Sequence, residues 1–316
     1  MNAASQPLTV SKARQVRVTV PATTANLGPG FDTLGLSLAL YDTLEVSVRA
    51  DGPLLIEVTG MGADAVPRDE RHLVHRAIAH TFAAVGRELP ALRLRAHNVI
   101  PHGRGLGSSA AAIVSGVVAA EGLLAGEVEF SDALKLRLAT ELEGHPDNVA
   151  PALFGGLTIA WMTPDGPQAK KLLVHRGVSP LVLVPSTEMS TELARSLQPQ
   201  SVPHEDAVFN VSRSALLVAA LTQSPELLMA ATEDKLHQHY RAAAMPETDR
   251  LIRLLRQAEY PAVVSGAGPS ILVLASDPSD RIKAAELVAA ETVADPWQAL
   301  PLAVDFLGST WSEFDS

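Results

Sequence analysis

Glycine, serine and alanine are concentrated in residues 101–111, PHGRGLGSSAA, which follow a predicted strand and open a predicted helix. The three glycines let the backbone turn tightly and approach a ligand without a Cβ atom in the way. The helix start presents free N–H groups and the positive end of its dipole, and the two serines can add hydroxyl ligands for phosphate or Mg²⁺. The pattern indicates a phosphate-binding loop, although a serine-capped glycine turn accounts for it equally well. The lysine of a Walker A loop is missing, and the glycine spacing differs from the Rossmann fingerprint.

A second segment with polar side chains is PATTANLGPGFDTLG, residues 21–35, directly after the first predicted strand. We expect a loop here that carries Asn26 and Asp32 on either side of a Gly-Pro-Gly turn. Long loops that follow a strand and carry polar side chains are where binding residues usually lie. The alternative is a turn in which both side chains bond only to nearby backbone.

A third segment is ELEGHPDNVAPALFGG, residues 141–156, at a predicted helix end near Gly144. The helix dipole disfavours carboxylates at this end, so Glu141 and Glu143 suggest a bound cation. The His-Pro-Asp-Asn that follows also suits an ordinary turn. A fourth segment, SGAGPS at residues 265–270, lies between two predicted strands and by itself indicates only a tight turn.

The strands and helices that must position these segments are grouped rather than alternating. Period-two alternation and apolar runs predict strands at residues 16–20, 44–48, 92–95, 181–184 and 271–275. Helical periodicity predicts helices at residues 73–85, 110–124, 134–142, 208–219, 251–258 and 281–290, with Ser131 and Ser224 as caps. This grouping favours an α+β fold over a doubly wound sheet. The length of 316 residues, at about 150 per domain, and the turn signal at residues 163–167 predict two domains, 1–170 and 171–316.

The overall composition excludes several classes of partner and chemistry. A formal net charge of -10 argues against a broad surface for nucleic acid or anionic membrane, so an anionic substrate would need a local binding device. With 0 Cys, disulfides, thiolate metal sites and cysteine nucleophiles are excluded. The first residues lack the apolar stretch of a signal peptide, and residues 110–126 are too short and too interrupted for a membrane span. We therefore expect a soluble, cytoplasmic protein.

Several ordered motifs together carry a family resemblance. They are PATTANLGPGFDTLG, PHGRGLGSSAAA, EGHPDNVAPALFGG and SGAGPS, with STEMSTELAR at residues 186–195, FNVSRSALL at 209–217 and HQHYR at 237–241. The chain thereby resembles the GHMP small-molecule kinases and, within them, the homoserine kinase family, from about Val18 to Leu274. Thr24 departs from the family's usual serine but keeps the hydroxyl.

This resemblance implies a two-domain GHMP kinase fold of the α+β class. Its N-terminal half would be like domain 2 of ribosomal protein S5, and its C-terminal half would be ferredoxin-like, with the site between them. The implied reaction is ATP + L-homoserine → ADP + O-phospho-L-homoserine, a step towards threonine, with Mg²⁺ as cofactor and a homodimer as the assembly. Alternatives are a GHMP kinase for another small alcohol, such as a mevalonate-like one, and a non-catalytic binding protein on this scaffold.

The resemblance also implies roles for individual residues. The substrate would be bound by Asn26, Asp32, His145, Asp147, Asn148, Thr191, Arg195 and Arg241. The nucleotide would be bound by Pro101, His102, Gly103, Arg104, Gly105, Leu106, Gly107, Ser108, Ser109, Ala110, Ala111, Gly266 and Gly268. Catalysis is assigned to Glu141, Glu143, Asp147 and Asn148, with Asp147 either a base or a substrate ligand.

Two of these assignments rest on simple chemistry. Arg195 and Arg241 can pair with the substrate carboxylate, because a planar guanidinium gives bidentate geometry, and with Asp32 they favour an amino acid over mevalonate. Magnesium needs oxygen ligands, for which Ser109 and one helix carboxylate are the candidates. Glu141 and Glu143 compete for that role, and alignment with relatives that have a longer loop favours Glu141.

Overall fold

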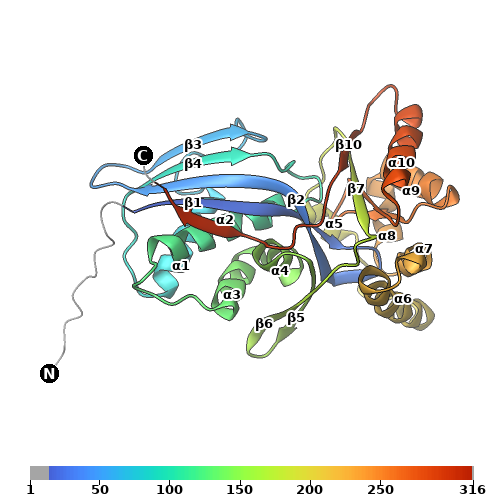
Figure 1. The fold of residues 1–316 in the computed structure, drawn as a ribbon, viewed down its shortest axis with the longest axis horizontal. Coiled ribbons are helices and arrows are strands. Elements are labelled where there is room, and N and C mark those ends of the chain that lie inside the picture. The colour runs from blue at the N-terminus through green and yellow to red at the C-terminus, as the bar shows by residue number, and fades with distance from the viewer. Residues whose placement is uncertain (1–13, 315–316) are drawn as a thin grey trace.

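The structure is a computed structural model that describes residues 14–314, and its chain forms two parts that lie side by side (Figure 1). The first part is built on a seven-stranded sheet with the order β11-β1-β2-β4-β3, in which β5 pairs with β2 and β6 with β5. All of its pairs are antiparallel except β3 with β4. The strands are β1 (Gln15–Asn26), β2 (Gly30–Val48), β3 (Leu55–Gly60), β4 (Leu92–Asn98), β5 (Leu157–Thr163), β6 (Gly166–Leu172) and β11 (Thr310–Glu313).

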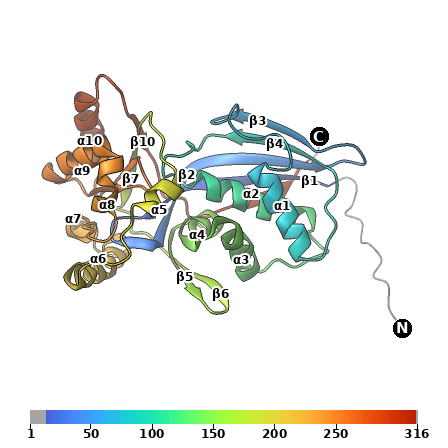
Figure 2. The same ribbon diagram turned by 180° about the vertical axis from the view of Figure 1, so that it is seen from behind.

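Four helices cover one face of this sheet, as Figure 2 shows from behind. They are α1 (Leu73–Ala84), α2 (Ser108–Leu123), α3 (Asp132–Glu143) and α4 (Pro146–Phe154). Helix α2 packs on β1 and α4 packs on β2. The starts of both helices lie near the end of the β1–β2 hairpin, because Thr23 of β1 bonds to Leu106 just before α2 and to Asn148 in the first turn of α4.

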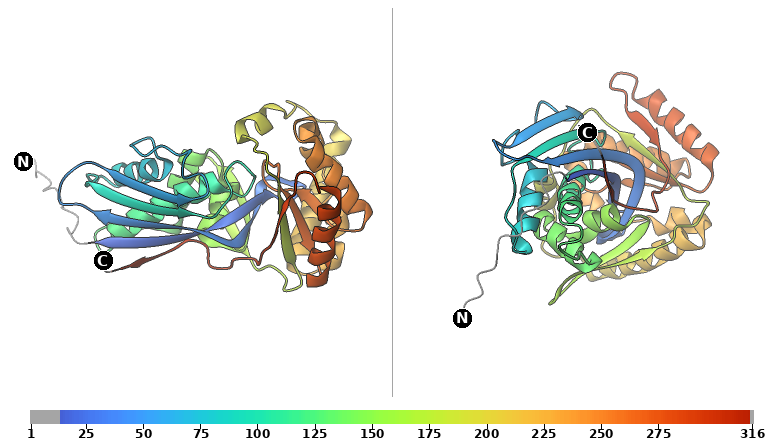
Figure 3. Two further views of the ribbon diagram at one scale, coloured as in Figure 1. Left: turned by 90° about the horizontal axis from the view of Figure 1, so that it is seen from above. Right: turned by 60° about the vertical axis from the view of Figure 1, so that its left-hand side comes forward.

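The second part, seen from above in the left view of Figure 3, contains a separate sheet. This sheet has four antiparallel strands in the order β10-β7-β9-β8. Its strands are β7 (Ser179–Val184), β8 (Ala262–Val264), β9 (Ile271–Ala275) and β10 (Gln298–Pro301). Its helices are α5 (Thr191–Ser196), α6 (His204–Thr222), α7 (Leu228–Ala231), α8 (Gln238–Arg241), α9 (Pro246–Gln257) and α10 (Pro278–Glu291), with short 3₁₀ turns η1 (Pro225–Leu227) and η2 (Ala242–Ala244). Within residues 14–314, no helix is both long and apolar enough to span a bilayer.

The strands and helices predicted from hydrophobic periodicity are confirmed. Val16, Val18 and Val20 are fully buried while Arg17 between them is exposed, as period-two alternation requires. Ser131 caps α3 by accepting a hydrogen bond from the Leu134 N–H at 3.2 Å, whereas Ser224 makes no such bond before η1. The predicted α+β class with two parts is also confirmed.

The expectation of a long loop at residues 21–35 is wrong. Strand β1 continues to Asn26 and β2 begins at Gly30, so only three residues form the turn between them. The two strands pair along most of this stretch, with register shifts after Pro21 and after Ala25. At the second shift residues 31–34 of β2 have no partner on β1. Cross-strand pairing therefore overrides the turn preference of the glycines and prolines.

The second sheet does not begin at the predicted domain boundary. Residues 163–167 form the tight turn between β5 and β6, and residue 170 lies inside β6. The end of the chain also returns to the first sheet, where β11 pairs with β1. The division into 1–170 and 171–316 therefore stays a prediction, and no single cut separates the two sheets.

Candidate active site

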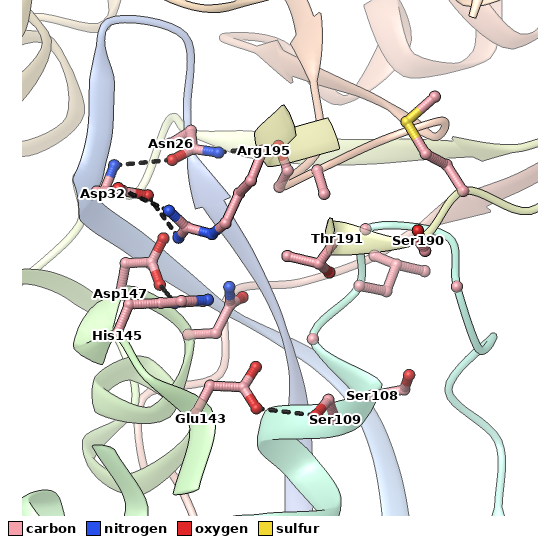
Figure 4. A pocket seen from close by; sticks show the side chains of 18 of the residues that line it. Asn26, Asp32, Ser108, Ser109, Glu143, His145, Asp147, Ser190, Thr191 and Arg195 are labelled. Atoms are coloured by element: carbon pink, nitrogen blue, oxygen red, sulfur yellow. Dashed lines mark hydrogen bonds and ion pairs between the residues drawn. The ribbon is translucent and has the colours of Figure 1, made fainter. Parts of the chain in front are cut away.

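A cavity of about 230 Å³ lies where the two parts meet, and Figure 4 shows the side chains that surround it. Six segments line it: the end of the β1–β2 hairpin, the glycine-rich loop before α2, the α3–α4 junction, the start of α5, the end of α8 and the loop after β8. Its lining residues are Asn26, Asp32, Gly103, Gly105, Leu106, Gly107, Ser108, Ser109, Glu143, His145, Asp147, Asn148, Met189, Ser190, Thr191, Arg195, Arg241, Gly266 and Ala267.

The hairpin end places Asn26 and Asp32 together at one wall of the cavity. Both adopt left-handed backbone conformations, with φ of 72° and 53°, which asparagine and aspartate tolerate better than most residues. The Asn26 amide donates to the Gly266 carbonyl at 2.8 Å and accepts from the Asp32 N–H at 3.0 Å. These bonds tie the hairpin to the second part and fix the backbone that carries Asp32.

The glycine-rich loop is held between the hairpin and the loop after β8. The Ser265 hydroxyl lies 2.7 Å from the Gly105 carbonyl, and the Thr23 N–H donates to the Leu106 carbonyl at 3.1 Å. A Cβ on Gly105 would lie 2.0 Å from the Ser265 carbonyl oxygen, so no larger residue fits there. Helix α2 then begins at Ser108, and Ser108 and Ser109 line the cavity. The unpaired N–H groups at a helix start are suited to bind an anion.

The α3–α4 junction brings an acid and a histidine into the cavity. Gly144 ends α3 with φ of 92°, and His145 precedes α4, which begins at Pro146. The first turn of α4 holds Asp147, where the helix dipole favours a negative charge. Its almost fully buried carboxylate contacts His145 Nδ1. Burial would lower the pKa of His145, but its hydrogen bond and charge interaction with Asp147 raise it.

Glu143 and Ser109 form the pair that faces the start of α2. The Ser109 hydroxyl donates to Glu143 Oε2 at 2.8 Å. Burial raises the pKa of Glu143, and the Ser109 hydrogen bond offsets only part of that rise. Burial therefore disfavours the charged form of this carboxylate, and a neighbouring positive charge would stabilise it.

Two arginines lie beside Asn26 and Asp32, and they differ in burial. Arg195 makes a bidentate pair with Asp32, at 3.1 Å and 2.9 Å, with both side chains open to solvent. Arg241 is only 2% exposed and donates to the carbonyls of Ala194 at 3.2 Å and Gly266 at 3.3 Å. Its guanidinium also lies 5.3 Å from the centre of the Phe31 ring. Burial lowers the pKa of Arg241 from its ordinary value.

The cavity therefore gathers most of the residues singled out from the sequence. It does not gather Glu141, which pairs with His80 at 2.8 Å and with Arg137 at 3.3 Å instead. The structure thus places Glu143 in the cavity, where the sequence reasoning had favoured Glu141. Other expected nucleotide-binding residues that do not line this cavity are Pro101, His102, Arg104, Ala110, Ala111 and Gly268.

Three lining residues were not expected from the sequence: Met189, Ser190 and Ala267. Ser190 caps α5 by accepting from the Leu193 N–H at 3.1 Å. A serine before a helical run is a recognisable cap signal, so Ser190 could have been found.

A second cavity of about 280 Å³ shares Ser108 and Ser109 with the first. Apolar and polar residues line it in similar numbers. The apolar ones include Leu44, Val66 and Ala112, and the polar ones include Asp42 and His102, which was among the expected nucleotide-binding residues. Asp42 accepts from the N–H groups of Val99 and Ile100 at 2.6 Å and 2.9 Å. The start of α2 thus lies between two cavities, one polar and one more apolar.

The cavity residues fit a magnesium ion whose coordination is completed by water and by the phosphates of a bound substrate. Among residues 14–314, no group of three or more histidines and carboxylates is arranged to hold a metal alone. Magnesium commonly takes only one or two carboxylates and completes its shell with water and substrate phosphates. Ser109 and Glu143 supply a hydroxyl and a carboxylate beside the helix start, which suits that mode.

Comparisons with known proteins show which family the chain is similar to. The family of GHMP kinase N-terminal domains matches residues 72–156, and that of GHMP kinase C-terminal domains matches residues 216–293. A homoserine kinase of Clavibacter michiganensis subsp. michiganensis is 70% identical over 95% of both chains, and one of Streptomyces coelicolor is 49% identical over 95% of both. The crystal structure of homoserine kinase from Cytophaga hutchinsonii has a TM-score of 0.85 and 26% identity, covering 98% of this chain and 100% of that one.

Proposed function

This chain belongs to the GHMP kinases and, within them, to the homoserine kinase family, and from that premise we propose how its cavity works. It transfers the terminal phosphoryl group of ATP to the side-chain hydroxyl of L-homoserine, giving O-phospho-L-homoserine and ADP in threonine biosynthesis. The observation that carries this assignment is the Asp32–Arg195 ion pair in the same cavity as the glycine-rich loop. Opposite charges beside a phosphate site match a zwitterionic substrate that must receive a phosphoryl group.

The amino acid end of L-homoserine exchanges partners with that ion pair. Its ammonium takes the place of Arg195 beside Asp32. Its carboxylate then pairs with the guanidinium groups of Arg195, which has released Asp32, and of Arg241. Asn26 and Thr191 add polar contacts from either side. Each charged group of the site therefore keeps an opposite charge beside it when the substrate binds, and no charge is left buried and unpaired.

The reacting hydroxyl lies towards the α3–α4 junction. Asn148 orients it, since its amide group is fixed by the Thr23 hydroxyl, which donates to Asn148 Oδ1 at 2.9 Å. His145 holds one oxygen of Asp147, and the other oxygen remains for a substrate ammonium or hydroxyl. We assign Asp147 to holding the substrate rather than to removing a proton.

The phosphates of ATP lie on the N–H groups of residues 103–109 and at the start of α2. The nucleoside occupies the second cavity, because that cavity shares Ser108 and Ser109 with the first and one phosphate chain can join the two. Ser109 and Glu143 would hold Mg²⁺, which supplies neutralisation of phosphate charge when bound. The chain's own contribution is positioning of both substrates, which can account for a large part of a phosphoryl-transfer barrier.

The direct test is a coupled ADP assay with L-homoserine, L-serine and mevalonate, with products identified by mass spectrometry. We expect Mg²⁺-dependent turnover with L-homoserine and far less with L-serine, which is one methylene shorter, or with mevalonate, which lacks the ammonium. A preference for mevalonate would point to another GHMP kinase activity. No Mg²⁺-dependent ADP with any acceptor would favour the non-catalytic alternative.

Family likeness also supports a homodimer and a cytoplasmic location for this chain. Light scattering of the purified protein tests the first: a dimer has twice the chain mass of 33.3 kDa. A mass of one chain at assay concentrations would contradict it.

We expect Arg241→Lys to raise the KM for L-homoserine about tenfold or more, since hydrogen bonds to charged groups contribute about 1.5–3 kcal/mol each. Lysine loses the bidentate geometry and the anchoring bonds to Ala194 and Gly266. Nucleotide affinity, measured by calorimetry, should stay unchanged. The matched control is Arg256→Lys, at an arginine of the same part that bonds to the Met229 and Ala262 carbonyls away from this cavity. Equal losses for both substrates in Arg241→Lys would refute the carboxylate role.

The pH dependence of activity should report the Glu143 carboxylate. Its pKa is raised by burial, so the ionised form that binds a cation is lost at a higher pH than for an exposed glutamate as the pH falls. We therefore expect kcat/KM for MgATP to fall, on the acid limb of its pH profile, at a higher pH than an exposed glutamate would give. Ser109→Ala removes a bond that lowers this pKa and should move the limb to still higher pH, whereas Ser108→Ala should not. A limb that stays in place in Ser109→Ala and in Glu143→Gln would show that another group sets it.

A further inference from the structure

Arg104 belongs to the glycine-rich loop, but its side chain turns away from the cavity and reaches the other part of the molecule. Its Nε donates to the Pro185 carbonyl at 3.0 Å and its Nη2 to the Ser186 carbonyl at 2.6 Å. Its Nη1 donates to Glu188 Oε1 at 3.0 Å and to the His102 carbonyl at 2.8 Å. The side chain is only 19% exposed, unlike a solvated surface arginine. A guanidinium with this many fixed partners is a built contact rather than a free charge.

Residues 185–190, which we call the strap, connect β7 to α5 and receive these bonds. The backbone adds a further tie, because the Met189 N–H donates to the Gly103 carbonyl at 2.9 Å. On its other side the strap is anchored in the second part, where the Ser186 hydroxyl bonds to the Asp295 carboxylate at 2.9 Å and 3.0 Å. The strap is therefore held between the phosphate loop and the second part.

The strap leads directly into the residues that face the amino acid. Ser190 ends it and caps α5, whose residues Thr191 and Arg195 line the cavity (Figure 4). The Arg241 guanidinium also bonds to α5, at the Ala194 carbonyl. A continuous set of bonds thus runs from Arg104 through the strap and α5 to Arg195.

We propose that Arg104 is a positioning residue that couples the ATP-phosphate site to the amino acid site. Phosphates bound on the N–H groups of residues 103–109 add bonds to a loop that is otherwise tied at the carbonyls of Gly103, Gly105 and Leu106, and so order it further. The ordered loop fixes Arg104 and with it the strap, so the entropy cost of ordering α5 is already met when L-homoserine arrives. Each substrate then strengthens the binding of the other by the same factor, as linkage requires.

The inference rests on the proposed function and is tested by calorimetry on the whole protein. L-Homoserine is titrated alone and with saturating Mg²⁺ and the β,γ-imido analogue of ATP. In the unaltered chain we expect the nucleotide to tighten L-homoserine binding about fivefold or more, the lower end of usual couplings between sites. In Arg104→Met the factor should fall to below about twofold, and Arg104→Lys, which supplies fewer bonds, should lie between. The matched control is Arg93→Met, because Arg93 forms an ion pair with Glu57 on the far strands and should leave the coupling intact.

A second measurement separates coupling from a merely structural role. Hydrogen exchange of the amides in residues 185–196 should slow when nucleotide binds to the unaltered chain, and should not respond in Arg104→Met. An unchanged coupling factor in Arg104→Met, or none in the unaltered chain, would overturn the inference. The proposed function fails separately, through absence of turnover and of L-homoserine binding in the unaltered chain.

Discussion

Glu143→Gln is expected to lower kcat by about two to three orders of magnitude, the effect typical of removing one group that stabilises transition-state charge. Glutamine keeps the shape of the side chain but loses the negative charge that faces Ser109 at the start of α2. Without it, phosphate charge is neutralised less well, and the dependence of rate on Mg²⁺ concentration should shift to higher concentrations. The measurement is kcat at saturating L-homoserine over a magnesium titration.

Glu141→Gln is the matched control, because it makes the same change two residues away on the same helix. Glu141 is half exposed, and its partners are His80 and Arg137 outside the cavity, so we expect kcat to change less than about twofold, as for most exposed ion pairs. A large loss in Glu141→Gln with a small one in Glu143→Gln would reverse the assignment of the metal ligand.

The choice between these two glutamates shows where sequence reasoning ends. Residues two apart on a helix are related by a rotation of about 200° about its axis, so they point to nearly opposite sides. Only one of the two can therefore face α2. Which one does so depends on the rotation of α3, and that is set by its buried residues, among them Leu138 and Ala139, packing against neighbouring helices. Alignment with relatives that have a longer loop favoured Glu141. Because such an alignment carries no information about the packing of α3, it could not show which glutamate faces α2.

Local sequence patterns were sufficient to predict most of the segments that form the site. The glycine-rich loop, the helix end at Gly144 and the small residues at 265–270 were visible because each depends on neighbours in sequence. The contacts that join them were not visible: Asn26 reaches Gly266 across 240 residues, and Arg104 reaches Ser186 across 82. Arg104 was expected to bind nucleotide only as a member of residues 101–111, and nothing in that segment indicates where its side chain points.

Asp147→Asn is the second change with a large expected effect, and it should appear in KM rather than in kcat. Removing one partner of a buried charged contact costs about 2–5 kcal/mol, so we expect the KM for L-homoserine to rise about 30-fold or more. The kcat at saturating substrate should fall by less than about tenfold, because Asn148, Glu143 and the glycine-rich loop still position the reacting groups. Steady-state kinetics at saturating MgATP separate the two parameters.

The control for this change is Asp305→Asn, since Asp305 is also a buried carboxylate with fixed donors. It accepts from the hydroxyls of Ser37 and Tyr41 at 3.2 Å and 3.0 Å, outside the cavity. Loss of stability from a buried carboxylate should therefore appear in urea unfolding of both variants, but only Asp147→Asn should change the KM for L-homoserine. A proton-abstracting base behaves differently, because its loss lowers kcat by about two to four orders of magnitude. That result with an unchanged KM would make Asp147 the base, with its free oxygen against the substrate hydroxyl.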